Sequence, residues 1–308
     1  MGNIPDYYKR INIYFKVGVL KILLIGVDSI NMPVYTIGKG FRELGHITAI
    51  LNAQDIFSIC HDFAYDLYEY DVRKRQIKLS SLSKIIDLDT FDMVFIQQLW
   101  LHTINDLDIP VYYYHSEPQA PVTVKNATNV GLGYVEAVNQ LKRFYPREFF
   151  SWKTKNFLWF GVDPSQYTPI PDDEKIPGVH FISNAEHRPE ATREDSPYWS
   201  RNIYMFREAI LKKFEKDIIV HPYIDYLEYT KLLPTFESVA VIHGNGCYPN
   251  QRAFEALAAG CKIEIYHENE MSRYAYRLLG PMTRENILAN HTYLNRAKQI
   301  LYEVAESG

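Results

Sequence analysis

The chain has 308 residues, 47% of them hydrophobic, and a formal net charge of −4 at pH 7. This is the composition of a globular protein with room for two cores, and it argues against a nucleic-acid binder that neutralises phosphates. Three cysteines without metal-ligand spacing predict reduced thiols. We find no secretory signal and no membrane-spanning run, so we expect a cytoplasmic protein.

The first half of the chain predicts the start of a parallel α/β sheet. Its apolar runs are continuous and rich in β-branched residues, which is typical of strands buried on both faces. The loop after the first strand contains no glycine, which disfavours a pyrophosphate clamp and an NAD enzyme. The expected elements are strands at 19–28, 46–52, 91–98 and 109–114 and a helix at 36–44.

A turn-rich segment from Gly161 to Pro171 contains three prolines and predicts an interdomain linker. A second α/β pattern follows, with strands expected at 179–182, 217–221, 238–243 and 262–266, helices at 201–214, 226–233 and around Glu255, and one long final helix at 283–305. The domains predicted are an acceptor domain at 1–158, the linker at 159–171, a donor domain at 172–282, and a carboxyl-terminal helix at 283–308 that packs back on the first domain.

The segment from Asn250 to Gly260 is the most informative motif. Phe254, Leu257 and Ala258 recur at helical spacing, which predicts a buried helix face. Gly260 stands where a left-handed helix cap is wanted, and a strand follows it. Glu255 lies off the apolar stripe, so we expect it to face a cleft.

This Phe-Glu-Ala-Leu-Ala-Ala-Gly helix resembles the carboxyl-terminal nucleotide-sugar site of GT-B glycosyltransferases, and the Phe-Gly-Val-Asp-Pro run that begins at Phe160 resembles their domain crossover. The resemblance implies two Rossmann-like domains that face a central cleft. It implies a UDP- or GDP-sugar as donor, no cofactor, no metal, and retention of configuration. Cys247 stands where many retaining members have a second Glu, so the chain is nearer to the spore-coat-maturation type.

The resemblance also implies roles for individual residues of the donor half. Glu255 would hold the ribose hydroxyls, and positive groups with backbone amides would bind the diphosphate. Asn250 could cap the helix, and glycines let amides approach an anion closely. The donor-binding residues expected are Arg188, Gly244, Asn245, Asn250, Arg252 and Glu255.

The catalytic residues expected are His115 and Glu117, which follow the strand at 109–114. In open α/β sheets ligands bind at the carboxyl ends of strands. By resemblance His115 would face the reacting sugar or acceptor, and Glu117 would be an acceptor-side carboxylate. Alternatively, His115 caps its strand through bonds to the backbone.

Three other interpretations remain open. Asp87-Leu88-Asp89 fits the Asp-x-Asp pattern of metal-dependent glycosyltransferases, but it precedes a strand rather than ending one. A basic stretch at 125–155 could contact nucleic acid in a DNA-base-modifying enzyme of the same fold, or a peripheral membrane surface, although the net charge indicates neither. A non-catalytic nucleotide- or sugar-binding protein would keep Glu255 without needing His115.

Overall fold

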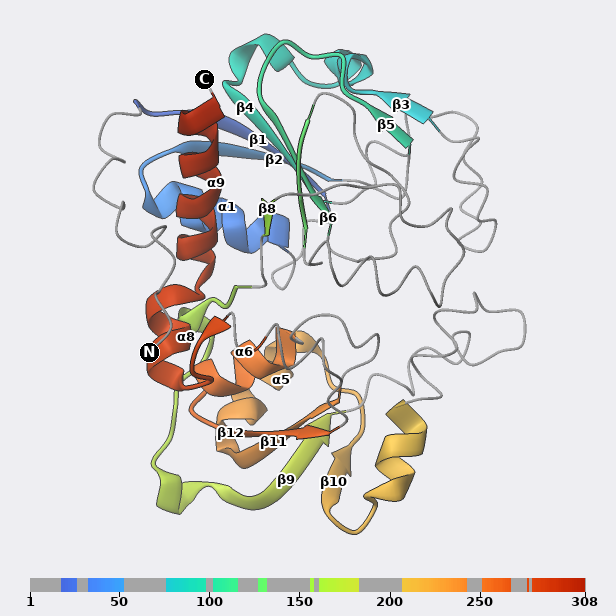
Figure 1. Ribbon diagram of the computed structural model, residues 1–308, viewed down its shortest axis with the longest axis vertical. Helices are drawn as coiled ribbons and strands as arrows, with labels where there is room; N and C mark the ends of the chain where they lie inside the picture. The colour runs from blue at the N-terminus through green and yellow to red at the C-terminus, as the bar shows by residue number, and fades with distance from the viewer. Residues whose placement is uncertain are drawn as a thin grey trace.

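The structure is a computed structural model, and it describes residues 18–26, 33–52, 76–97, 102–115, 127–131, 156–157, 161–182, 207–242, 251–266, 276 and 279–307. Two parallel sheets with helices lie one above the other along the long axis (Figure 1). This is the α/β architecture that the apolar strand pattern predicts.

The first sheet has the strand order β2-β1-β4-β6-β7-β8, and every pairing in it is parallel. Its strands are β1 (Lys21–Gly26), β2 (Ile47–Asn52), β4 (Met93–Gln97), β6 (Val111–His115), β7 (Thr128–Gly131) and β8 (Asn156–Phe157). A separate parallel pair, β3 (Gln76–Lys78) and β5 (His102–Ile104), flanks it. The 3-10 helices η3 (Leu79–Lys84) and η4 (Leu88–Thr90) come before β4.

Strand β1 shows why the continuous apolar run forms an interior strand. Ile22 and Leu24 belong to the core on one face of the sheet, whereas Leu23 and Ile25 belong to the core on the other. All four side chains are fully buried. Successive side chains of a strand point to opposite faces of the sheet, and both faces of this sheet are covered. Consecutive positions of β1 are therefore all buried, which favours an apolar residue at each of them.

The second sheet has the order β10-β9-β11-β12 and is also parallel. Its strands are β9 (Ile176–Ile182), β10 (Ile218–His221), β11 (Phe236–Ile242) and β12 (Lys262–Tyr266). Residues 207–213 are helical and precede β10. The other elements of this half are η6 (Pro164–Gln166), η7 (Asp172–Glu174), α5 (Tyr226–Leu232), η10 (Leu233–Thr235), α6 (Gln251–Ala258) and α8 (Arg284–Asn290).

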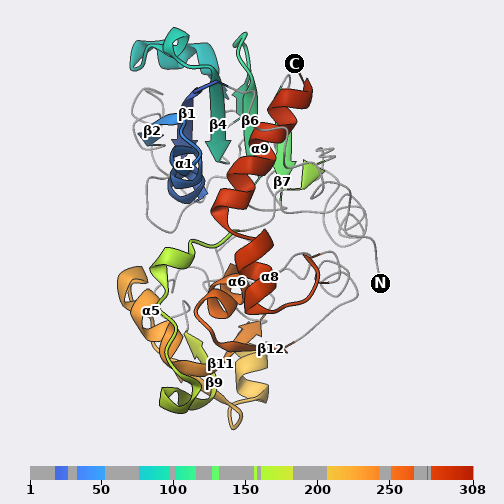
Figure 2. The same cartoon turned by 90° about the vertical axis from the view of Figure 1, so that its left-hand side faces the viewer.

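Helix α9 (Tyr293–Ser307) runs back alongside the first sheet (Figures 1 and 2). It packs against α1 (Pro33–Glu43). Tyr293, Ala297 and Ile300 join Phe41 of α1 in one buried cluster. Helix α9 therefore completes the core on one face of the first sheet.

The prediction of one continuous helix at 283–305 is wrong, because α8 and α9 are separate. Val162 pairs with the chain at the break: its N–H donates to the His291 carbonyl at 3.0 Å, and its carbonyl accepts from the Tyr293 N–H at 3.1 Å. Thr292 and Asn295 also bond reciprocally, as in a capping box, and so start a new helix. A tertiary pairing thus interrupts a pattern that is helical on both sides.

Candidate functional site

The candidate site lies at the carboxyl edge of the second sheet. Strands β9, β10 and β11 are parallel and therefore end at the same edge, at Ile182, His221 and Ile242. Helix α6 begins after β11 and lies on the face of this sheet that is turned towards the first sheet (Figures 1 and 2). Gly260 ends the helical segment with φ +84°, which confirms the predicted left-handed cap.

Glu255 is held by a hydrogen bond to each oxygen of its carboxylate. The Tyr229 hydroxyl donates to Oε2 at 2.9 Å, and the Gln251 side-chain amide donates to Oε1 at 2.9 Å. Each oxygen has a second acceptor position, because a carboxylate offers about four lone-pair sites. By lone-pair count, each oxygen of the fork therefore keeps one acceptor position beyond the bond it already makes.

Glu255 is more buried than the amphipathic pattern predicts, with only 7% of its surface exposed. Residues 253–258 of α6 are all buried. Helix α6 packs against β11, β12 and α8, and Tyr229 of α5 contacts its glutamate side. The small alanine side chains of α6 let these neighbouring elements approach the helix closely on several sides. A residue off the apolar stripe, such as Glu255, is therefore buried as well.

Burial raises the pKa of the Glu255 carboxyl, although the bonds from Tyr229 and Gln251 and the charge of Arg252 oppose the rise. The folded protein thus holds this proton more tightly than the unfolded chain does. The carboxyl contributes stability at low pH, and this contribution is lost as the pH rises from 4.5 through the raised pKa. Above that range the ligand-free protein carries a buried charge.

We therefore expect Glu255→Gln to stabilise the ligand-free protein at pH 7.5, because glutamine has the same size and no charge. Tm should rise by about 2–4 °C for each kcal/mol gained. Thermal unfolding at pH 7.5 and at pH 4.5 measures this difference, which should shrink at the lower pH. A glutamine variant that unfolds below the wild type at pH 7.5 would contradict the expectation.

Arg252 lies in the first turn of α6, next to the end of β9. Its guanidinium stacks over the ring of Phe181, 4.6 Å from the ring centre. Phe181 itself is buried, so it offers a fixed platform for the cation. Arg252 thus brings a positive charge to the carboxyl edge of the sheet, where an anion would meet it.

A chain of hydrogen bonds joins α5 to the first half of the molecule. The Tyr226 hydroxyl donates to Gln166 at 2.7 Å, the Gln166 amide contacts Asp163 at 3.5 Å, and Lys39 of α1 forms an ion pair with Asp163 at 2.7 Å. Tyr226 lies one helical turn before Tyr229, yet its hydroxyl bonds to a different group. The two tyrosines therefore occupy similar positions on α5, but removing one hydroxyl breaks different hydrogen bonds from removing the other.

The structure places only part of the predicted site. Glu255 and Arg252 lie together on α6, and His115 is the last residue of β6, at the carboxyl edge of the first sheet. For His115 the structure describes the backbone alone. Glu117, Arg188, Gly244, Asn245 and Asn250 lie outside the described residues. The roles of all these residues stay predictions.

Tyr229 and Gln251 are the site residues that sequence reasoning missed. Gln251 stands four residues before Glu255, a spacing at which helical side chains meet, so this contact had a readable signal. Tyr229 comes from a different helix, and no local pattern indicates that its hydroxyl reaches Glu255.

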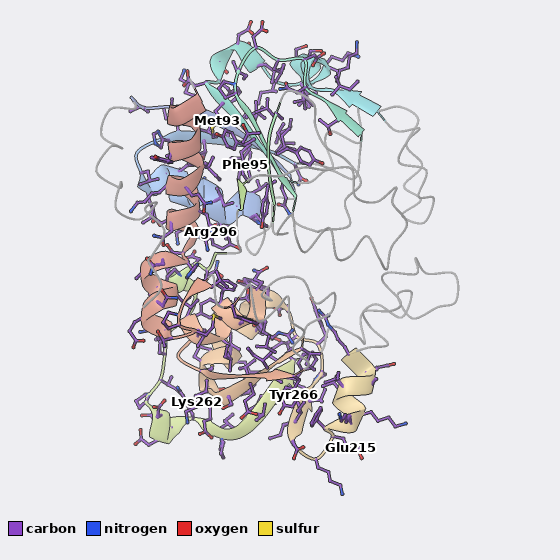
Figure 3. The ribbon with its side chains drawn as sticks, in the orientation of Figure 1. Met93, Phe95, Glu215, Lys262, Tyr266 and Arg296 are labelled. Atoms are coloured by element: carbon purple, nitrogen blue, oxygen red, sulfur yellow. The ribbon has the colours of Figure 1, made fainter. Side chains whose placement is uncertain are left out.

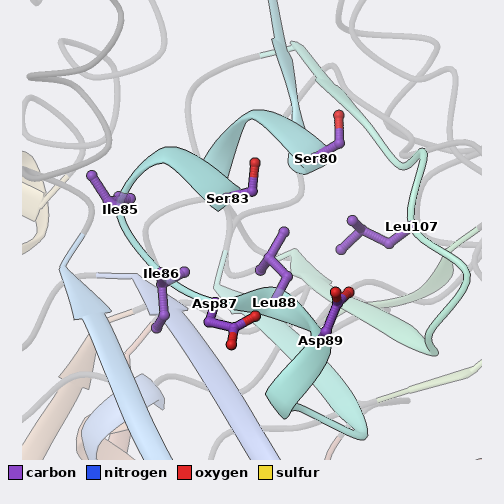
Figure 4. Close-up of a pocket in the computed structure, with 8 residues that line it drawn as sticks. All are labelled: Ser80, Ser83, Ile85, Ile86, Asp87, Leu88, Asp89 and Leu107. Carbon is purple, nitrogen blue, oxygen red and sulfur yellow. The ribbon is translucent and has the colours of Figure 1, made fainter.

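The Asp-x-Asp motif lies at the amino edge of the first sheet, opposite the carboxyl edge where His115 lies. Asp87 immediately precedes η4, which comes before β4, as the sequence predicts. Figure 4 shows Asp87 and Asp89 in a pocket with Ser80 and Ser83. Among the described residues, no three His, Cys, Asp or Glu side chains are grouped so that they could hold one metal ion.

The architecture matches solved structures of glycosyltransferases. The chain is similar to AviGT4, a glycosyltransferase involved in avilamycin A biosynthesis, with 13% identity, a TM-score of 0.52, and coverage of 92% of this chain and 96% of that one. It is also similar to sucrose-phosphate synthase from Thermosynechococcus elongatus, with 10% identity, a TM-score of 0.50, and coverage of 94% and 99%. No family model and no curated protein sequence matches the chain.

At these identities the likeness shows the fold. The chain has the GT-B fold, which confirms the fold class predicted from the two motifs. No helix in the described ranges combines the length and apolar character that crossing a bilayer requires.

Proposed function

We propose that this protein is a glycosyltransferase that moves a sugar from a nucleotide-sugar donor to a hydroxyl acceptor. The observation that carries the proposal is the Glu255 carboxylate, whose two oxygens are each oriented by one donor and can each accept one more. Two adjacent ribose hydroxyls are a fitting ligand for such a fork. The fold that the chain shares with AviGT4, itself a glycosyltransferase, supports the same activity.

In the proposed reaction the bond between the anomeric carbon and the diphosphate oxygen breaks, the acceptor oxygen bonds to that carbon, and the acceptor's proton passes to the leaving diphosphate. Negative charge grows on the leaving nucleoside diphosphate and needs fixed positive groups. Arg252 and Arg188 would supply them, with the backbone amides around Gly244 and Asn245, so the reaction needs no metal. His115 would face the transferred sugar, and Glu117 the acceptor. Retention of configuration is proposed on the family resemblance.

The proposal is tested by nucleotide binding in the presence of EDTA. We expect UDP or GDP to raise the Tm of the wild-type protein, and Glu255→Ala to raise the Kd by about tenfold or more. That change corresponds to about 1.4 kcal/mol, the scale of hydrogen bonds to a charged group. Isothermal titration calorimetry gives the Kd directly.

Glu264→Ala is the matched control, because Glu264 is an exposed carboxylate of β12 in the same half of the molecule. We expect it to leave nucleotide affinity unchanged. Equal affinity in wild type and Glu255→Ala would remove Glu255 from the site. Tight nucleotide binding without any release of sugar from a nucleotide-sugar, with or without an acceptor, would favour the non-catalytic binding protein.

A further inference from the structure

Tyr229 approaches Glu255 from a separate helix that is itself firmly anchored. Asp225 caps α5, with its carboxylate accepting from the N–H groups of Leu227 and Glu228 at 2.8 and 3.0 Å. The Tyr229 ring stacks near that of Tyr226, with centroids 5.9 Å apart, and its side chain is almost fully buried. The hydroxyl that reaches Glu255 Oε2 is therefore on a rigid support.

Gln251 approaches the other oxygen from the first turn of α6 itself. The Glu255 carboxylate is thus bonded from two helices, one donor to each oxygen. A glutamate side chain with free rotamers would present its oxygens in many directions, whereas this one is locked before any ligand arrives. Because the Glu255 side chain is already ordered, it loses less conformational entropy when a ligand binds.

We propose that Tyr229 and Gln251 are positioning residues that aim Glu255 at the ribose diol and so determine the preference for ribonucleotides over analogues that lack the hydroxyls. The inference rests on the proposed function and assigns the specificity of the same site. A ribose diol donates one hydrogen bond to each oxygen. If one oxygen turns away, one hydroxyl loses its acceptor, but a 2′,3′-dideoxynucleotide loses nothing.

The same bonds affect the charge of the fork. Burial raises the pKa of Glu255, and the bond from Tyr229 opposes this because it favours the ionised form. The charged group that acts on the carboxyl is Arg252, because raised pKa values keep the nearby phenols of Tyr167, Tyr226 and Tyr293 neutral between pH 5 and 8. Without the Tyr229 hydroxyl the pKa of Glu255 rises further, so ribonucleotide binding should be lost at a higher pH as the solution is acidified.

The chain offers a matched pair of variants to test this. Tyr229→Phe removes the hydroxyl that bonds Glu255 and keeps the ring, whereas Tyr226→Phe removes a neighbouring hydroxyl that bonds Gln166. Gln251→Met removes the second donor and keeps the side-chain length. The probes are UDP, GDP and their 2′,3′-dideoxy counterparts, with Kd measured by calorimetry from pH 5 to 8, after circular dichroism has verified that each variant folds.

We expect Tyr229→Phe and Gln251→Met each to raise the ribonucleotide Kd about fivefold or more and to leave the dideoxynucleotide Kd within about twofold. In Tyr229→Phe the pH at which ribonucleotide binding is half lost should move upward. Tyr226→Phe should match the wild type in all of these measurements.

Three outcomes would overturn the inference: a Tyr229→Phe protein with wild-type ribonucleotide affinity, an equal loss for ribo- and dideoxynucleotides, or the same loss in Tyr226→Phe. Glu255→Ala separates this failure from that of the proposed function. If Glu255→Ala weakens ribonucleotide binding and Tyr229→Phe does not, the positioning role of Tyr229 is refuted and the proposed function is not. If neither variant weakens it, or if the wild type binds neither UDP nor GDP, the nucleotide site itself falls.

Discussion

Replacing His291 by alanine is expected to lower the free energy of unfolding at pH 7 by about 3 kcal/mol, because it removes bonds to a charged group and leaves buried polar atoms behind. His291 Nδ1 accepts from the Arg296 guanidinium at 2.8 Å, and Nε2 donates to the Leu279 carbonyl at 3.0 Å. Both side chains are almost fully buried, at 3% and 2% exposure. Arg296 lies near the level where the two halves meet (Figure 3). Urea unfolding measures the loss.

The same histidine makes a prediction about pH. Burial and the charge of Arg296 lower the pKa of His291 from 6.5 to about 3. Between these two values the imidazole is protonated in the unfolded chain and neutral in the folded protein. The free energy of unfolding therefore falls as the pH drops from 6.5 towards 3. The loss from this group approaches about 1.4 kcal/mol per pH unit inside that window.

His291→Gln is the matched variant, because glutamine can accept from Arg296 and donate to Leu279 but does not titrate. We expect it to be more stable than His291→Ala at pH 7, and its free energy of unfolding to fall less than that of the wild type between pH 6.5 and 4. Glu255 acts in the opposite direction, so the comparison must be made between variants. Parallel pH profiles for the wild type and His291→Gln would refute the assignment.

The sequence predicts an element well when the element's own residues determine it, and poorly when contacts with distant parts of the chain do. The strands β1, β4 and β11 lie inside their sheets and each contains a run of consecutive apolar residues, and such runs can be recognised because burial on both faces favours apolar residues at most positions. The short strands β7 and β8 were missed, because they span only four and two residues and owe their pairing to neighbours in the sheet, β7 to β6 and β8 to β7. The break before Tyr293 was missed for the same reason, since Val162 comes from a distant part of the sequence.

The candidate site divides in a similar way. Glu255 and Arg252 could be found because a helix with a glycine stop before a strand resembles a known donor site. The environment of Glu255 could not, because Tyr229 reaches it through tertiary packing. A motif thus points to the residue for which a binding role is proposed, whereas the orientation and charge state of that residue depend on neighbours that no spacing rule connects.

Gly40→Leu is expected to destabilise the protein by about 3 kcal/mol, because it overpacks the contact between α1 and α9. A Cβ at Gly40 would stand 2.9 Å from the Tyr293 carbonyl oxygen and 3.0 Å from the Ala297 Cβ, closer than such atoms approach without displacement. The Tyr293 oxygen belongs to the backbone beside the pairing with Val162, so it cannot easily retreat.

Gly40→Ala gives the sharper test, because helix propensity alone would make alanine more stable than glycine by about 1 kcal/mol. We expect the opposite sign, with a loss of about 1 kcal/mol or more, if the two helices are in contact as the structure has them. Ala297→Gly should relieve part of the strain, so the double variant should be more stable than the sum of the single changes predicts, by about 0.5 kcal/mol or more. Additive losses, or a stabilising Gly40→Ala, would mean that α9 does not rest on α1 at this glycine. Helix α9, which follows the second sheet in the sequence, would then contact the first half of the molecule in some other way.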